Sequence, residues 1–164
     1  MSVSMPTAAE LLEGRRRGLV TGGGGFIGGA VVRRLLLESD ALVFNLDKMG
    51  YASDLTGIEA VLKQQGAAAA GRHQLLHVDL ADADAVQQAV QQADPDLVLH
   101  LAAESHVDRS ISGPGVFMES NVTGTYNLLQ AVRAHYEGLS GERKECFRLH
   151  HISTDEVFGS LGAE

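Results

Sequence analysis

A glycine-rich turn between an apolar run and a helical pattern constrains this 164-residue chain most. The apolar run is 18–21, and residues 21–28 read TGGGGFIG. From Ile27 to Leu35 apolar residues recur at spacings of three and four, which indicates one helical face. Glycines in such a turn let the backbone approach a pyrophosphate, and the N-terminus of the helix stabilises the negative charge of that pyrophosphate. The context predicts a dinucleotide-binding turn in one of two registers, whereas the alternative is a flexible turn that binds nothing. The registers are Gly22, Gly25, Gly28 and Gly23, Gly25, Gly28.

The rest of the chain alternates between strand and helix patterns. Two further buried strands are predicted at 41–46 and 74–78, and two more strands at 97–101 and 147–153. Helices are predicted from about residue 55, from Asp82 or Asp84 to just before Pro95, and over 116–136, with 66–71 as a surface loop or a frayed helix end. This alternation predicts an α/β fold, a Rossmann-type doubly wound parallel sheet truncated after about five strands. We expect residues 1–14 to form an N-terminal arm with a short helix at 8–13, and residues 15–164 to form the dinucleotide-binding domain.

Charge and cysteine content exclude several classes of function. The chain has 13 Lys and Arg against 21 Asp and Glu, a net charge of −8, which argues against nucleic acid or an anionic membrane as the main partner. Cys146 is the sole cysteine, so it has no internal disulfide partner. The first residues show neither a signal peptide nor a membrane span, and we expect a cytoplasmic protein.

The histidines favour a structural interpretation. His150 and His151 are consecutive on a predicted strand, so their side chains point to opposite faces and do not chelate one metal ion. His100 lies among apolar residues and is expected to be a hydrogen-bonded core residue. We therefore expect no metal site.

Acidic residues follow two of the predicted strands. Asp47 ends the second strand about 20 residues after Gly28, where a carboxylate accepts hydrogen bonds from the adenosine ribose hydroxyls and repels a 2′-phosphate. This favours NAD over NADP, although the neighbouring Lys48 weakens the charge argument. Asp79 and Leu80 end the third strand, where an adenine would lie, but Asp also ends strands for reasons of turn geometry alone.

Six segments together carry a resemblance to a known family: 21–28, 47–48, 79–80, 100–111, 121–125 and 150–159. They resemble the extended short-chain dehydrogenase/reductase family, and within it the enzymes that dehydrate dTDP-glucose. The two long segments, HLAAESHVDRSI and HHISTDEVFG, are the most specific. Epimerases and other nucleotide-sugar dehydratases of the family are similar in the glycine turn, but they typically carry a different pair where this chain has Asp155 and Glu156.

The resemblance implies an NAD-dependent, redox-neutral dehydration of dTDP-glucose, or of a related nucleotide sugar, to a 4-keto-6-deoxy sugar. It implies that Thr154 hydrogen-bonds the C4 oxygen, that Asp155 is the acid for the leaving C6 hydroxyl and that Glu156 is the base for the C5 proton. Without the resemblance, these acids would read as a solvated pair or a helix cap.

The resemblance also implies a set of binding positions. Ser105 corresponds to a substrate contact and Ser120 to a cofactor contact on the nicotinamide side. The other implied cofactor contacts are Gly22, Gly25, Phe26, Ile27, Gly28, Asp47, Lys48, Asp79, Leu80, Leu101, Ala102, Ala103 and Glu104.

The chain departs from the family in one decisive way. The family removes the C4 hydroxyl proton with a tyrosine that is followed four residues later by a lysine, and no Tyr-x-x-x-Lys occurs in the 164 residues. Phe158 stands where the family usually has Tyr, and Met49-Gly50 after Lys48 is a smaller difference. We expect that the C-terminal substrate domain is absent and that the chain alone is catalytically incomplete. The alternatives are a stand-alone or split NAD-binding module, or a related dehydratase or epimerase.

The expected absence of the C-terminal part predicts self-association. Members of the family form homodimers through the helix that corresponds to 116–136. We expect an apolar face on this helix and an exposed edge on the fifth strand, and both features favour association between copies.

Overall fold

The computed structural model describes residues 6–159, without the side chains of Val107, Asp155 and Glu156. Five parallel strands form one sheet in the order β3-β2-β1-β4-β5. This order confirms the Rossmann-type doubly wound sheet predicted from the alternating pattern. The strands are β1 (Arg17–Thr21), β2 (Leu42–Asp47), β3 (His73–His77), β4 (Leu97–His100) and β5 (Arg148–His151).

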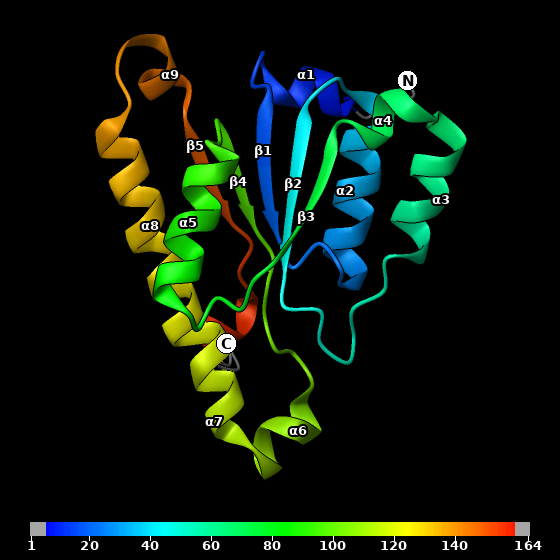
Figure 1. Ribbon diagram of the computed structural model, residues 1–164. Helices are drawn as coiled ribbons and strands as arrows, with labels where there is room; N and C mark the ends of the chain where they lie inside the picture. The colour runs from blue at the N-terminus through cyan, green and yellow to red at the C-terminus, as the bar shows by residue number, and fades with distance from the viewer. Residues whose placement is uncertain (1–5, 160–164) are drawn as a thin grey trace, which may run out of the picture.

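Helices cover both faces of the sheet (Figure 1). On one side lie α2 (Phe26–Glu38) and α3 (Thr56–Gln65), and on the other lie α5 (Ala83–Ala93) and α8 (Gly124–Gly138). Side chains of β1 alternate between the two layers: Leu19 belongs to the core cluster with α5 and α8, and Val20 to the cluster with α2 and α3. The fold is therefore a three-layer α/β/α arrangement with two apolar cores.

The parallel register brings the carboxyl ends of the strands to one edge of the sheet. Thr21 of β1 is paired with Leu46 of β2 and with His100 of β4, and Asp47 is paired with His77 of β3. The segments that follow these strands lie together at the lower end of the molecule in Figure 1. This is the edge at which open α/β sheets bind ligands.

The N-terminal segment contributes to the core. Helix α1 (Ala8–Leu12) begins at a capping box formed by Thr7 and Glu10, and Ala8 and Leu12 are buried with residues of α2. The Glu38 carboxylate of α2 accepts a hydrogen bond from the Ala8 backbone N–H at 2.8 Å. The predicted arm thus packs against the domain.

Several helical details differ from the sequence expectation. The helix predicted over 116–136 is divided into α7 (Pro114–Phe117), a π-helix η1 (Met118–Thr123) and α8. Residues 66–71 hold a short helix, α4 (Ala67–Ala70), because Gly66 at φ +75° interrupts α3 and lets Ala69 turn into the core. Three further short elements carry no clear periodicity in the sequence: α6 (Val107–Ser112), α9 (Gly141–Cys146) and a 3-10 helix η2 (Asp155–Phe158).

In the part of the chain that the structure describes, no helix has both the length and the apolar character needed to cross a bilayer.

Candidate cofactor site

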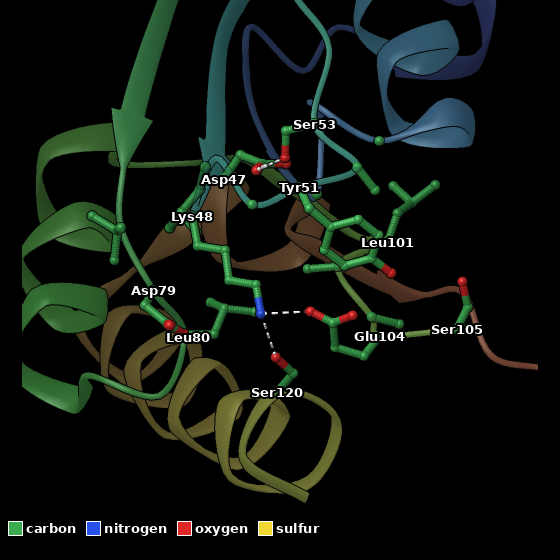
Figure 2. Close-up of a pocket in the computed structure, with 18 residues that line it drawn as sticks. Asp47, Lys48, Tyr51, Ser53, Asp79, Leu80, Leu101, Glu104, Ser105 and Ser120 are labelled. Carbon is green, nitrogen blue, oxygen red and sulfur yellow. Dashed lines mark hydrogen bonds and ion pairs between the residues drawn. The ribbon is translucent and has the colours of Figure 1, made fainter. Parts of the chain in front are cut away.

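One pocket collects most of the predicted binding positions at the carboxyl edge of the sheet (Figure 2). It is lined by the turn after β1, by the segments after β2, β3 and β4, and by η1. Phe26, Ile27 and Gly28 do not line it, and the side chains of Phe26 and Ile27 are exposed. The predicted positions that line it are Gly22, Gly25, Asp47, Lys48, Asp79, Leu80, Leu101, Ala102, Ala103, Glu104, Ser105 and Ser120.

The glycine turn is sterically restricted. Gly22 has φ +73°, and a Cβ atom there would lie 2.6 Å from Ala102 Cα. A Cβ atom at Gly28 would overlap the carbonyl oxygen of Gly22. Gly25 precedes α2 without a side-chain cap, so no side chain occupies the helix N-terminus in the way an N-cap residue would. The turn therefore leaves backbone N–H groups for a ligand at the place where a helix favours an anion.

Asp47 ties this turn to the segment after β2. Its Oδ2 accepts a hydrogen bond from the Gly24 N–H at 2.8 Å, and its Oδ1 accepts from the Met49 N–H and the Ser53 hydroxyl, both at 2.8 Å. The residue is 7% exposed. A carboxylate accepts about four hydrogen bonds, so one acceptor position is left for a ribose hydroxyl. Its role toward a ribose stays a prediction, while its role in holding the turn is a finding.

Lys48 spans the pocket. Its Nζ lies 2.7 Å from Glu104 Oε1 and donates a hydrogen bond to Ser120 Oγ at 2.9 Å, as Figure 2 shows. The ammonium is thus held by residues after β4 and on η1. The charge of Lys48 weakened the argument that Asp47 favours NAD over NADP. In the structure this charge is paired with Glu104 on the other side of the pocket.

Asn121 holds the backbone at Glu104, and sequence reasoning assigned it no function. Its Oδ1 accepts from the Glu104 N–H at 2.8 Å, and its Nδ2 donates to the Glu104 carbonyl at 2.9 Å. Both Asn121 and Ser120 lie in the π-helix, an irregularity that is frequent at functional sites. Asn121 belongs to the segment 121–125, which carries part of the family resemblance. Its pairing with the Glu104 backbone, however, depends on tertiary structure.

His100 is a hydrogen-bonded core residue, as predicted. Its Nδ1 lies 2.6 Å from Thr21 Oγ1 and its Nε2 lies 2.9 Å from Thr125 Oγ1. Since Thr21 Oγ1 also accepts from the Ala102 N–H, a neutral ring that carries its proton on Nε2 satisfies the network. Burial, together with the nearby His151, lowers the pKa of His100 to about 4. This network joins β1 and β4 directly beneath the pocket.

The predicted catalytic segment follows β5. The Ile152 N–H donates to the His100 carbonyl at 3.0 Å, which extends the β4–β5 pairing toward Thr154. Thr154 is exposed, and the backbone of 155–158 forms η2. The side chains of Asp155 and Glu156 lie outside the described residues, so their predicted roles are untested. Ser105 is exposed and lines the pocket.

Within residues 6–159, excluding the side chains of Val107, Asp155 and Glu156, no group of three His, Cys, Asp or Glu is arranged to hold a metal ion.

Comparison with known proteins places the chain in a family. The sequence profile of the family described as GDP-mannose 4,6 dehydratase matches residues 19–164, and the chain belongs to this family. Within it, the chain is homologous to the N-terminal region of dTDP-glucose 4,6-dehydratases. It is 49% identical over 143 residues to that enzyme from Shigella flexneri and 48% identical to dTDP-glucose 4,6-dehydratase 1 from Escherichia coli. Each alignment covers 87% of this chain and 38% of the relative.

Solved structures agree with this assignment. The chain resembles DesIV, a dTDP-glucose 4,6-dehydratase from Streptomyces venezuelae crystallised with NAD bound, with a TM-score of 0.69 and 37% identity. That match covers 90% of this chain and 42% of DesIV. UDP-glucose 4-epimerase from Thermus thermophilus, in complex with NAD, matches at a TM-score of 0.59 and 32% identity over 73% of this chain and 34% of the epimerase. The chain thus spans about two fifths of the length of the dehydratases that it matches.

Proposed function

We propose that these residues form the NAD-binding part of a dehydratase that acts on dTDP-glucose or a related nucleotide sugar. The observation that carries the proposal is the restricted glycine turn, which is joined by Asp47 to the end of β2. DesIV, which this chain resembles, is a dTDP-glucose 4,6-dehydratase with NAD bound.

The pocket fits a dinucleotide at three places. The turn at Gly22 and Gly25 provides backbone for a pyrophosphate, and the remaining acceptor position of Asp47 suits a ribose hydroxyl. Asp79 and Leu80 line the side of the pocket to which we assign the adenine, and the segment 101–104 with Ser120 also lines the pocket. When bound there, NAD supplies a reversible hydride acceptor, which makes a redox-neutral dehydration possible.

In this proposal the segment after β5 faces the sugar. Thr154 donates a hydrogen bond to the C4 oxygen, and Ser105 contacts the substrate. Asp155 protonates the leaving C6 hydroxyl while Glu156 removes the C5 proton, which requires that the two carboxyl groups hold different protonation states. Glu156 thus acts at C5, next to the C4 carbonyl, and Asp155 acts at C6, one bond further along the sugar.

A second candidate function is an NAD-binding module that performs no dehydration by itself. The observation that favours it is the absence of Tyr-x-x-x-Lys: four positions after Tyr51, Tyr126 and Tyr136 stand leucine, glutamine and serine. Without a base for the C4 hydroxyl the C5 proton stays non-acidic, and the acid pair has no reaction to support. We propose that the 164 residues bind NAD but need a base from elsewhere, and that they act in the cytoplasm.

The test has a binding arm and a reaction arm. NAD is expected to raise the melting temperature of the purified chain, and Asp47→Asn is expected to reduce this rise. Asp82→Asn is the matched control, because Asp82 caps α5 and Asn caps a helix equally well. A melting temperature that NAD leaves unchanged would contradict the cofactor proposal.

In the reaction arm the chain is incubated with dTDP-glucose and NAD, and mass spectrometry measures loss of one water from the nucleotide sugar. We expect no loss. Loss of water would show that another residue or another copy supplies the base, and the second candidate would be wrong.

A further inference from the structure

Tyr51 and Arg109 meet at the mouth of the pocket, and neither has a role in the proposed function. Arg109 Cζ lies 3.7 Å from the centre of the Tyr51 ring, in the geometry of a cation–π contact. Tyr51 comes from the segment after β2 and lines the pocket, whereas Arg109 belongs to α6, which follows β4. In the sheet, β2 and β4 lie on opposite sides of β1. The contact therefore joins the two sides of the pocket, the segment after β2 and the segment after β4.

The contact is the outer of two links across the pocket. Figure 2 shows the Tyr51 ring directed across the pocket, toward the side that carries Glu104 and Ser105. The inner link is the ion pair between Lys48 and Glu104, at 2.7 Å. Both links join the segment after β2 to the segment after β4. Tyr51 and Arg109 are exposed, so separating them uncovers no buried core.

With these links in place the space between the two sides of the pocket is narrow. Its volume is about 150 Å³. Sites for drug-sized ligands typically enclose about 300–1,000 Å³, and NAD is larger than most drug-sized ligands. A dinucleotide bound at this edge therefore extends beyond the space between the two links, and separation of the two sides would widen its path in and out.

We infer that the Tyr51–Arg109 contact is a gate that controls the exchange of NAD at this pocket. The inference rests on the proposed function, since it presupposes that NAD is the ligand. A redox-neutral reaction regenerates NAD in each turnover, so a gate that slows cofactor exchange is compatible with that chemistry. The contact acts by holding the two sides of the pocket together, and it makes no bond to the cofactor.

Exchange kinetics distinguish a gate from a direct ligand contact. The chain contains no tryptophan whose fluorescence could report binding. The probe is therefore NADH, whose own fluorescence is followed in stopped flow. The association rate constant is measured by mixing, and the dissociation rate constant by displacement with excess NAD. The variants are Arg109→Met, which keeps an unbranched stem without the charge, Tyr51→Leu, which removes the ring, and the double variant.

Arg109→Met and Tyr51→Leu are each expected to raise both rate constants, by about two- to fivefold for a contact of this strength at an exposed site. The double variant is expected to be no faster than either single variant, because both act through one contact. Tyr51→Phe, which keeps the ring, is expected to match the unaltered chain. Arg133→Met is the matched control, since Arg133 is an exposed arginine on α8 whose ion pair with Glu137 lies outside the pocket.

Three results would overturn the gate. Unchanged rate constants in Arg109→Met and Tyr51→Leu would show that the contact does not limit exchange. Faster dissociation without faster association would show that the residues bind the cofactor directly. Failure of the unaltered chain to bind NADH would overturn the gate and the proposed function together, whereas normal binding with unchanged variant rates would overturn the gate alone.

Discussion

Lys48 Nζ and Glu104 Oε1 lie 2.7 Å apart and form an ion pair between the segments that follow β2 and β4. The Glu104 side chain is only 12% exposed, whereas that of Lys48 is 34% exposed. A carboxylate with so little access to water depends on its ammonium partner, so loss of Lys48 leaves an uncompensated charge in the pocket wall. This asymmetry makes the pair a structural link as well as part of the pocket.

Lys48→Met is expected to lower the free energy of unfolding by about 1–3 kcal/mol, the range for leaving a buried polar group unpaired. Adding Glu104→Gln should restore part of this loss, because the uncompensated charge disappears. Urea denaturation of the single and double variants measures the coupling. The control pair is Arg133 and Glu137, whose side chains are 68% and 63% exposed and whose coupling should be about 0.3–0.5 kcal/mol. A Lys48→Met loss no larger than that of Arg133→Met would contradict the prediction.

Gly28→Ala is expected to destabilise the chain and weaken NAD binding together. The new methyl group would overlap the carbonyl oxygen of Gly22, so the turn must shift, at a cost of about 1–3 kcal/mol in the free energy of unfolding. Gly115→Ala is the control, because a methyl group there meets no atom within 4 Å. Thermal unfolding with and without NAD measures both effects. Equal stability of Gly28→Ala and Gly115→Ala would show that the turn is not sterically restricted.

The stability of the chain should fall as the pH drops from 7 to 4. Burial lowers the pKa of His100 to about 4 from an ordinary value of 6.5, so between these values the unfolded chain binds a proton that the folded chain does not bind. The contribution of His100 is therefore fully present above pH 6.5 and is lost toward pH 4, by up to about 3 kcal/mol.

Denaturation of His100→Gln across this pH range isolates the effect. The variant should show a shallower pH dependence, whatever its stability at pH 7. Burial also lowers the pKa of His73, so His73 still contributes to the pH dependence of the unfolding free energy in the variant. An identical slope in the variant and the unaltered chain would contradict the assignment to His100.

The outer surface of α8 and the edge of the sheet should drive self-association. Tyr126, Leu129 and Tyr136 are exposed on α8, and β5 is the last strand of the sheet among the described residues. We expect the sedimentation coefficient to rise with protein concentration, and Leu129→Glu to reduce this rise. Leu37→Glu is the control, since Leu37 is similarly exposed on α2. A single monomeric species at all concentrations would count against the prediction.

Much of the fold follows from local sequence patterns. The glycine turn, the strands and helix α5 were predicted because strand and helix periods and capping are set within a few residues. The sequence left the cap of α5 open between Asp82 and Asp84, and in the structure it is Asp82. The parallel direction of the strands then follows from their alternation with helices. The exceptions are also informative: no local pattern distinguishes the π-helix at 118–123 from the α-helix that continues it.

By itself, the sequence determined the class of fold, the position of the glycine turn and the acids that end the strands. Only the tertiary structure decided which distant side chains meet: Lys48 with Glu104, Asn121 with the Glu104 backbone, and Tyr51 with Arg109. The reason is physical. Periodicity and turn chemistry act between neighbours along the chain, whereas a pocket wall forms only after parallel strands bring separate segments to one edge of the sheet.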